Sequence, residues 1–169
     1  TAINWRKDKR EEGRGTHEHL FAKMQPQAVP LEEAVLGALM LDKEAYRIVD
    51  GLLFPVHFYV EANTEIFKAI KSLHDTQRPV DILTVMEQLR RTRLLEKVGG
   101  PGYLAELTNR VASAANIEYH ARIIIQKWIM RAMIQASVEA TRKAYEDVED
   151  PIQLLEDYSA TITQIQRGL

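Results

Sequence analysis

Residues Ser113 to Tyr145 read SAANIEYHARIIIQKWIMRAMIQASVEATRKAY, and they contain neither glycine nor proline. At 3.6 residues per turn, such a stretch makes about nine turns of α-helix. This is far longer than the roughly 11–12 residues of an average helix in a globular protein. Ser113 suits the N-cap, where a hydroxyl accepts a hydrogen bond from a free backbone N–H. The sequence therefore predicts one long helix around which the fold is organised.

The apolar residues of this stretch lie on several faces of the expected helix. A helix on the surface of one domain has a single apolar stripe, so apolar residues on several faces indicate burial on several sides. We expect this helix to pack on the preceding segment, on the following segment and on another chain. The three faces consist of Ile117, Ala121, Ile124 and Trp128; of Ile125, Ile129, Ala132, Ala136 and Ala140; and of Met130, Ile134, Val138 and Tyr145.

Five shorter helices are expected before the long one, from their amphipathic patterns and end signals. Asp42 and Asp81 are candidate N-caps, and Gly51 is a candidate stop signal. An apolar turn over residues 52–59 separates the second helix from the third. The expected ranges are Leu31 up to Asp42, Lys43 to Asp50, Glu61 to Thr76, Ile82 to Arg91 or Thr92, and Tyr103 to Asn109.

The glycine-rich segment from Val98 to Gly102 invites comparison with phosphate-binding loops. The pattern GxxxxGK[ST] is absent, since Tyr103 and Leu104 follow Gly102. No strand pattern precedes the segment, as the GxGxxG motif of nucleotide-binding folds would require. We interpret it as a tight turn that opens the fifth helix.

Asp150-Pro151-Ile152-Gln153 is a strong helix-start signal, with Asp as N-cap and Pro at the first helical position. The last helix should run to about Arg167 and fold back on the long helix. The sequence therefore predicts an all-α protein, with a compact five-helix head followed by a long two-helix antiparallel hairpin. The expected division is a flexible N-terminal tail over residues 1–30, a helical head over 31–112 and the hairpin over 113–169.

Composition limits the classes of function. The net charge of −2 and the pI near 6.2 argue against strong sequence-independent DNA binding by this chain. The absence of cysteine excludes disulfides and cysteine-based catalysis or zinc binding. There is no apolar run long enough to span a membrane and no secretory signal, so a cytoplasmic protein is expected.

Candidate catalytic and metal-binding residues are few. No HExxH, nucleophile elbow or paired-carboxylate motif is present, so we expect no catalytic, cofactor or metal residue here. His17 and His19 lie in the tail without a second cluster that could complete a metal site. Ordinary packing is the preferred interpretation for His57, His74 and His120, although protonation of His120 could tune an interface.

Several segments, in order, carry a resemblance to a known family. They are LEEAVLGALMLD (31–42), Phe58-Tyr59, IFKAI (66–70), PVDILTV (79–85), LLEKVGG (94–100), YLAEL (103–107) and SAANIEYHARII (113–124). Together they resemble the N-terminal domain of the bacterial replicative DNA helicase, the DnaB family. The resemblance extends over about residues 26–169, and the tail before it has no counterpart.

The resemblance implies a hexameric, ATP-dependent parent enzyme whose C-terminal RecA-like part binds ATP and Mg and moves along single-stranded DNA. That part is absent from this chain, so we expect a non-enzymatic N-terminal fragment. The family's N-terminal domains form a trimer of dimers through their hairpins and receive the primase. A helicase loader is a further candidate partner.

Positions that match the family's hairpin are candidates for self-association, namely Ile125, Ile129, Met133, Ile134 and Tyr158. Two alternatives stay open. One is a small DNA-binding module with a basic face, and the other is the helicase-binding domain of a primase, which is also a helical head with a hairpin. The basic face would consist of Arg90, Arg91, Arg93, Lys97 and Arg110.

Overall fold

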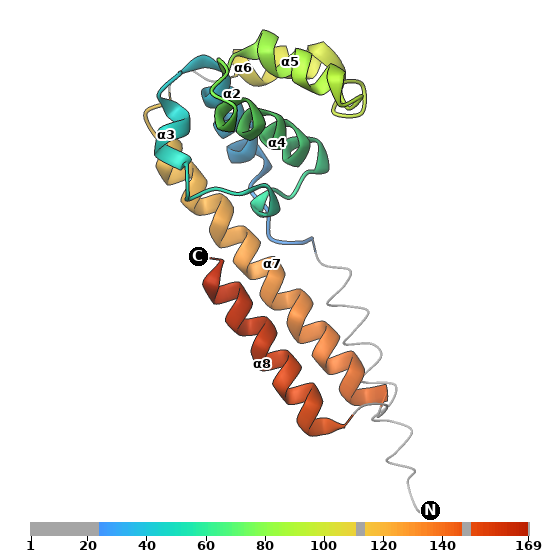
Figure 1. Cartoon of the computed structure of the whole chain (residues 1–169). Coiled ribbons are helices and arrows are strands. Elements are labelled where there is room, and N and C mark those ends of the chain that lie inside the picture. Colours follow the sequence, from blue (N-terminus) through green and yellow to red (C-terminus); the bar gives the residue numbers. More distant parts are fainter. Residues whose placement is uncertain (1–23, 111–113, 147–149, 169) are drawn as a thin grey trace, which may run out of the picture. The chain divides into compact units, whose positions relative to one another are not determined.

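The computed structural model describes residues 24–110, 114–146 and 150–168. These residues form seven α-helices and one short 3-10 helix, and no strand occurs among them (Figure 1). The predicted all-α class is confirmed. The elements are α2 (Val29–Leu41), α3 (Ala45–Val49), η1 (Pro55–His57), α4 (Glu61–Asp75), α5 (Ile82–Arg91), α6 (Gly100–Asn109), α7 (Ile117–Glu146) and α8 (Pro151–Arg167).

The chain forms two compact units, one built on residues 27–130 and the other on residues 131–167. The first unit holds the five helices α2 to α6, as predicted for the head, together with the first turns of α7. These turns belong to the head because Ile117, Ala121 and Ile124 are buried in its core. The second unit holds the rest of α7 and the helix α8.

The core of the head forms around α2, which packs against α4 and α6. Removal of large apolar side chains from water is the main driving force for such a core, at roughly 1.5–3 kcal/mol for each fully buried Leu, Ile or Phe. Every helix of the head contributes fully buried apolar side chains, and α3 contributes the smaller Ala45 and Val49. The largest are Phe67, Leu36, Leu39, Ile66, Ile70, Leu89, Leu104, Leu107 and Ile124.

One buried carboxylate joins three helices of the head. Glu32 on α2 is only 1% exposed and accepts hydrogen bonds from the backbone N–H groups of Tyr59 (2.6 Å) and Val60 (3.4 Å). Val60 is the N-cap of α4 and has no side-chain acceptor, so Glu32 supplies the negative charge that the helix start favours. Asn63 on α4 donates to Glu32 (3.0 Å) and accepts from the Tyr103 hydroxyl of α6 (2.7 Å). The network thus fixes α2, α4 and α6 together.

Two helices of the head end in the same backbone motif. At the end of α4 the N–H of Arg78 donates to the carbonyl of Leu73, and the N–H of Gln77 donates to the carbonyl of His74. Gln77 has φ 55°, in the left-handed region that such a helix end requires. Arg93, with φ 60°, ends α5 in the same way. Glycine is the usual residue at this position, so both helix ends are strained.

Helix starts agree with the predicted signals in part. The Asp81 carboxylate accepts from the N–H groups of Leu83 and Thr84, both at 2.9 Å, and confirms its predicted role as N-cap of α5. Asp150 accepts from the N–H of Ile152 (2.8 Å) where α8 begins. Ser113, predicted to cap the long helix, lies outside the described residues. The long helix α7 begins at Ile117, later than predicted, because residues 114–116 form a bend and a turn.

In the head, the predicted starts of the first, second and fifth helices differ from the structure. The first helix begins at Val29 rather than Leu31, because Pro30 is accommodated in its first turn, where an N–H is not needed. The second begins at Ala45 rather than Lys43, because Asp42 accepts from the N–H of Glu44 in a preceding turn.

The fifth helix begins at Gly100, before the predicted Tyr103. Gly99 adopts φ 111°, and a Cβ there would lie 2.9 Å from the Cβ of Tyr103. The glycine-rich segment therefore serves as a tight turn, as predicted, and its last residues are already helical.

Replacement of Glu32 by Gln should lower the free energy of unfolding of the chain by about 1.5–3 kcal/mol, since an amide cannot accept from all three donors. Glu33→Gln is the matched control. Glu33 pairs with the exposed Arg110, so its loss should cost less than about 1 kcal/mol. Urea denaturation followed by circular dichroism measures both values. Equal losses in the two variants would contradict the capping role of Glu32.

The stability of the head should fall at alkaline pH. Burial raises the pKa of Tyr103 to about 12, with a further contribution from Glu33 and Glu32, and burial also raises the pKa of Tyr46 to about 12. The folded pKa lies above the unfolded value, so the stabilisation is complete below about pH 10 and is lost as the pH rises towards 12. Denaturation at a series of pH values measures this loss, and the double variant Tyr46→Phe/Tyr103→Phe should show a smaller one.

Candidate functional site

Large apolar side chains remain exposed in the hairpin unit, as some also do in the head. The second half of α7 and the helix α8 lie side by side and run in opposite directions (Figure 1). The predicted fold-back of the last helix is therefore confirmed. The Ser137 and Tyr158 hydroxyls lie 3.2 Å apart and join the two helices by a hydrogen bond.

Small residues of α7 face α8. Ala132, Ala136 and Ala140 line an open groove of about 320 Å³ along the two helices, together with Leu154 and Tyr158 from α8. The groove also holds charged side chains at its edges, among them Glu139, Lys143 and Asp157. Arg142 bonds to Glu139 and holds the pKa of that carboxyl below its usual range, so the edge stays charged.

The side of the hairpin away from this groove is apolar and exposed. No residue of α8 is buried, and Ile152 and Leu155 are each 65% exposed. Met133 on α7 is 52% exposed. At 100° per residue, Leu155 and Ile162 project from the side of α8 that the groove does not occupy, and Met133 projects from the same side of α7. We call Met133, Ile152, Leu155 and Ile162 the apolar side of the hairpin.

The structure distributes the residues predicted for self-association over both units. Ile125 is only 8% exposed and packs in the head core, and Ile129 is partly buried against the same core. Their side chains therefore have little surface to offer a second copy. Met133 is exposed, whereas Ile134 and Tyr158 are half-buried in the hairpin unit.

Sequence reasoning left Ile152, Leu155 and Ile162 out of the candidate residues. The signal was present, because α8 carries two apolar seams and only one of them can face α7. The seam with Leu154, Tyr158 and Ile165 lines the groove. In the other seam Ile152 and Leu155 are exposed and Ile162 is half-buried.

The residues of the alternative basic face are largely neutralised by ion pairs. Arg90 pairs with Glu87 (2.8 Å) and Lys97 with Glu61 (2.7 Å). Arg110 pairs with both Glu33 and Glu106. Arg91 and Arg93 are exposed and have no ion pair to a described residue. Such a surface provides little of the excess positive charge that binding to phosphates needs.

The histidines that the structure describes have ordinary surroundings. His57 is buried, accepts a hydrogen bond from the N–H of Phe54 (3.1 Å) and packs on the Trp128 ring at 4.9 Å. His74 stacks on Tyr46, with ring centroids 4.0 Å apart, and His120 lies near Tyr119. Within residues 24–110, 114–146 and 150–168 there is no cluster of side chains that could hold a metal ion. His17 and His19 lie outside these ranges.

Among the described residues, none of the helices combines the length and the apolar character that crossing a bilayer requires.

Comparison with known proteins shows clear relatives. The chain is 46% identical over 143 residues to the replicative DNA helicase DnaB of Rhodothermus marinus, and this match covers 85% of the chain and 15% of the relative. It is 36% identical over 143 residues to the replicative DNA helicase DnaC of Bacillus subtilis, covering 85% of the chain and 32% of that relative. The chain thus spans about a third or less of the length of these curated relatives.

A solved structure has the same fold. The crystal structure of the N-terminal domain of DnaB helicase from Mycobacterium tuberculosis superposes with a TM-score of 0.80 at 31% sequence identity. The match covers 83% of this chain and 99% of that domain. Residues 24–126 also match the family described as DnaB-like helicase N terminal domain, and the chain therefore belongs to this family.

Proposed function

We propose that the chain is the assembly and primase-docking domain of a replicative DNA helicase. The observation that carries the proposal is the apolar side of the hairpin, where the described residues leave Met133, Ile152 and Leu155 exposed. The parent protein would be a hexamer that unwinds duplex DNA, with ATP and Mg bound by a separate C-terminal part. The names of the relatives support this parent activity, and their greater length leaves room for such a part.

The energy available from the apolar side favours a second copy as its partner. Burial of an exposed Leu or Ile contributes up to about 1.5–3 kcal/mol. A two-fold symmetric contact counts each such residue twice, once from each copy. Met133, Leu155 and Ile162 together therefore offer enough apolar surface for the centre of an interface, with charged side chains such as Glu156 at the rim.

Other functions have less support. The ion-paired surface around Arg90, Lys97 and Arg110 argues against the DNA-binding module. The match to the helicase family argues against the alternative that this chain is the helicase-binding domain of a primase. We assign no catalytic role to this chain, and ATP hydrolysis belongs in our proposal to the C-terminal part of the parent protein.

The isolated chain should form a dimer or a larger oligomer, and Leu155→Glu should weaken this association at least about tenfold, since a charge would have to be buried in the interface. Sedimentation velocity over a range of concentrations measures the effect. Leu83→Glu is the matched control, because Leu83 is a similarly exposed leucine (70%) on α5 of the head.

Two outcomes would count against the role of the hairpin in assembly. The first is a wild-type chain that stays monomeric at all concentrations. The second is an equal effect of the two substitutions. If the Leu155→Glu variant loses its helical circular dichroism signal, the milder Leu155→Ser replaces it in the comparison.

The chain should also bind the helicase-binding domain of the primase from the same organism with a dissociation constant in the micromolar range or tighter. Isothermal titration calorimetry measures the affinity. A primase fragment without that domain serves as the control. Binding of both fragments with equal affinity, or no heat with either, would refute the docking role while leaving self-association untouched.

A further inference from the structure

A shallow cleft of about 660 Å³ lies at the C-terminal end of α4, in the head and apart from the hairpin. It is lined by Lys43, His74, Asp75, Gln77, Arg78 and Pro79. Lys43 comes from the turn between α2 and α3, and the other residues come from the end of α4 and the segment that follows. Segments distant in the sequence thus place three basic side chains around one cleft.

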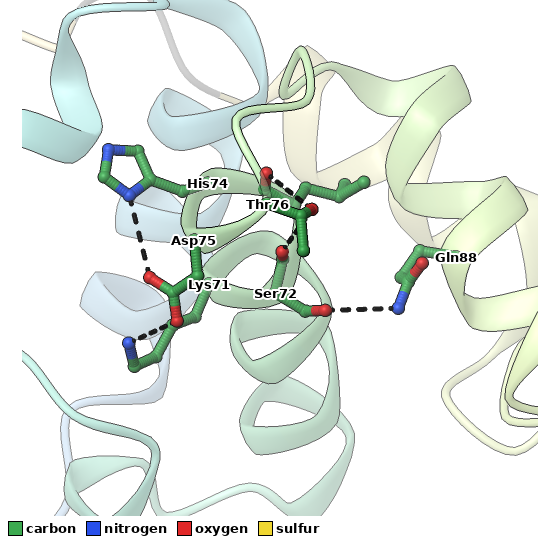
Figure 2. A network of polar contacts seen from close by, with 7 residues as sticks. Lys71, Ser72, His74, Asp75, Thr76 and Gln88 are labelled. Carbon is green, nitrogen blue, oxygen red and sulfur yellow. Dashed lines mark hydrogen bonds and ion pairs between the residues drawn. The ribbon is translucent and has the colours of Figure 1, made fainter.

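The end of α4 is held by a dense set of polar contacts (Figure 2). The Thr76 hydroxyl donates to the carbonyls of Ser72 (2.8 Å) and Leu73 (3.2 Å), and Gln88 of α5 donates to the Ser72 hydroxyl (3.4 Å). The strained Gln77 then turns the chain so that Arg78 and Pro79 reach the cleft. The backbone that carries Arg78 is therefore well fixed.

The acidic residue of the cleft is already engaged. Asp75 pairs with Lys71 at 2.8 Å through one oxygen, and His74 Nδ1 lies 3.8 Å from the other. Figure 2 shows the second ring nitrogen of His74 pointing away from Asp75. The ring itself is held by its stacking on Tyr46, at 4.0 Å between centroids.

The two other cations differ from most arginines of the surface. Arg47, Arg90, Arg110, Arg122 and Arg142 each contact a carboxylate. In the described part of the chain, the side chains of Lys43 and Arg78 form no hydrogen bond or ion pair, and both residues are exposed. Their charges are available to an external anion without the loss of an existing contact.

The surroundings distinguish between the kinds of anion that could bind. The cleft is open to solvent, and five of its six lining residues carry a polar or charged group, unlike the enclosed sites that take small molecules. Asp75 lines the cleft, and both Asp50 and Asp75 lie close enough to Tyr46, on which His74 stacks, to raise the pKa of Tyr46. A nucleic-acid strand needs many cationic contacts along its length and would meet these carboxylates. One or two carboxylates of a peptide could instead reach Lys43 and Arg78 directly, with Arg78 suited to bidentate contact.

We infer that the cleft between Lys43, His74 and Arg78 binds an acidic segment of a partner protein through its carboxylate side chains. This inference goes beyond the proposed function and does not depend on self-association through the hairpin. It concerns residues of the head alone and a partner recognised by negative charge.

The test uses the 169-residue chain and a short fluorescein-labelled peptide rich in glutamate, with fluorescence anisotropy at low salt as the readout. Lys43→Glu/Arg78→Glu should weaken binding at least about tenfold, a change of about 1.4 kcal/mol. Arg91→Glu/Arg93→Glu is the matched control. It makes the same change in net charge at the C-terminal end of α5, and neither residue lines the cleft. It should leave the affinity within about twofold, since distant exposed charges are largely screened.

Nuclear magnetic resonance locates the contact independently of any substitution. The amide signals of Lys43, Gln77 and Arg78 should shift on addition of the peptide, and a glutamine-rich peptide of the same length should shift none of them. The inference is overturned if the wild-type chain does not bind the acidic peptide, if both double variants lose binding equally, or if single-stranded DNA displaces the peptide and shifts the same signals.

Discussion

A carboxylate almost fully removed from water stands where three helices of the head meet. Glu32 cannot be buried as a charge without strong partners, and it finds them in the backbone N–H groups of Tyr59 and Val60, directly before α4, and in Asn63. The N-terminal end of α4 in turn has no acceptor from its own N-cap residue, Val60. Burial of the carboxylate or of these N–H groups without a partner would lower the stability of the fold. Bonded to each other, they hold α2 and α4 in one register. The hydroxyl of Tyr103 extends the same set of bonds to α6.

This fixed head explains how one helix can take part in two compact units. The first turns of α7 bury Ile117, Ala121 and Ile124 in the head, so the start of the helix is anchored by the same core. Beyond Met130 the helix belongs to the hairpin unit, where Ala136, 9% exposed, is its one buried apolar residue in the described segment. The hairpin therefore has a thin core of its own, and a partner surface would add to its stability as well as to assembly.

Much of the architecture could be predicted because its signals are local. Apolar periodicity located the helices, and Asp81 and Asp150 gave their starts, since a cap acts on residues that follow it directly. The boundaries that were missed depend on less local effects. Pro30 lies inside α2 rather than before it, and Gly100 already belongs to α6, because turn geometry and the contact between Gly99 and Tyr103 decide these ends. The role of Glu32 could not be predicted, since its partners follow it by about thirty positions.

The candidate site shows the same division between local and distant information. A helix with apolar residues on three faces indicates more apolar surface than one contact can bury. The pattern does not show which of these faces is buried in the core of the head. Ile125 and Ile129 match the periodicity of an interface residue as well as Met133 does, yet the head core takes up the first two. Leu154 and Tyr158 of α8 face the groove with α7. Helical geometry then places Ile152, Leu155 and Ile162 outside the groove, where a partner could contact them. The surface that a second copy could use is thus set by what the chain has already buried, which only the three-dimensional arrangement reveals.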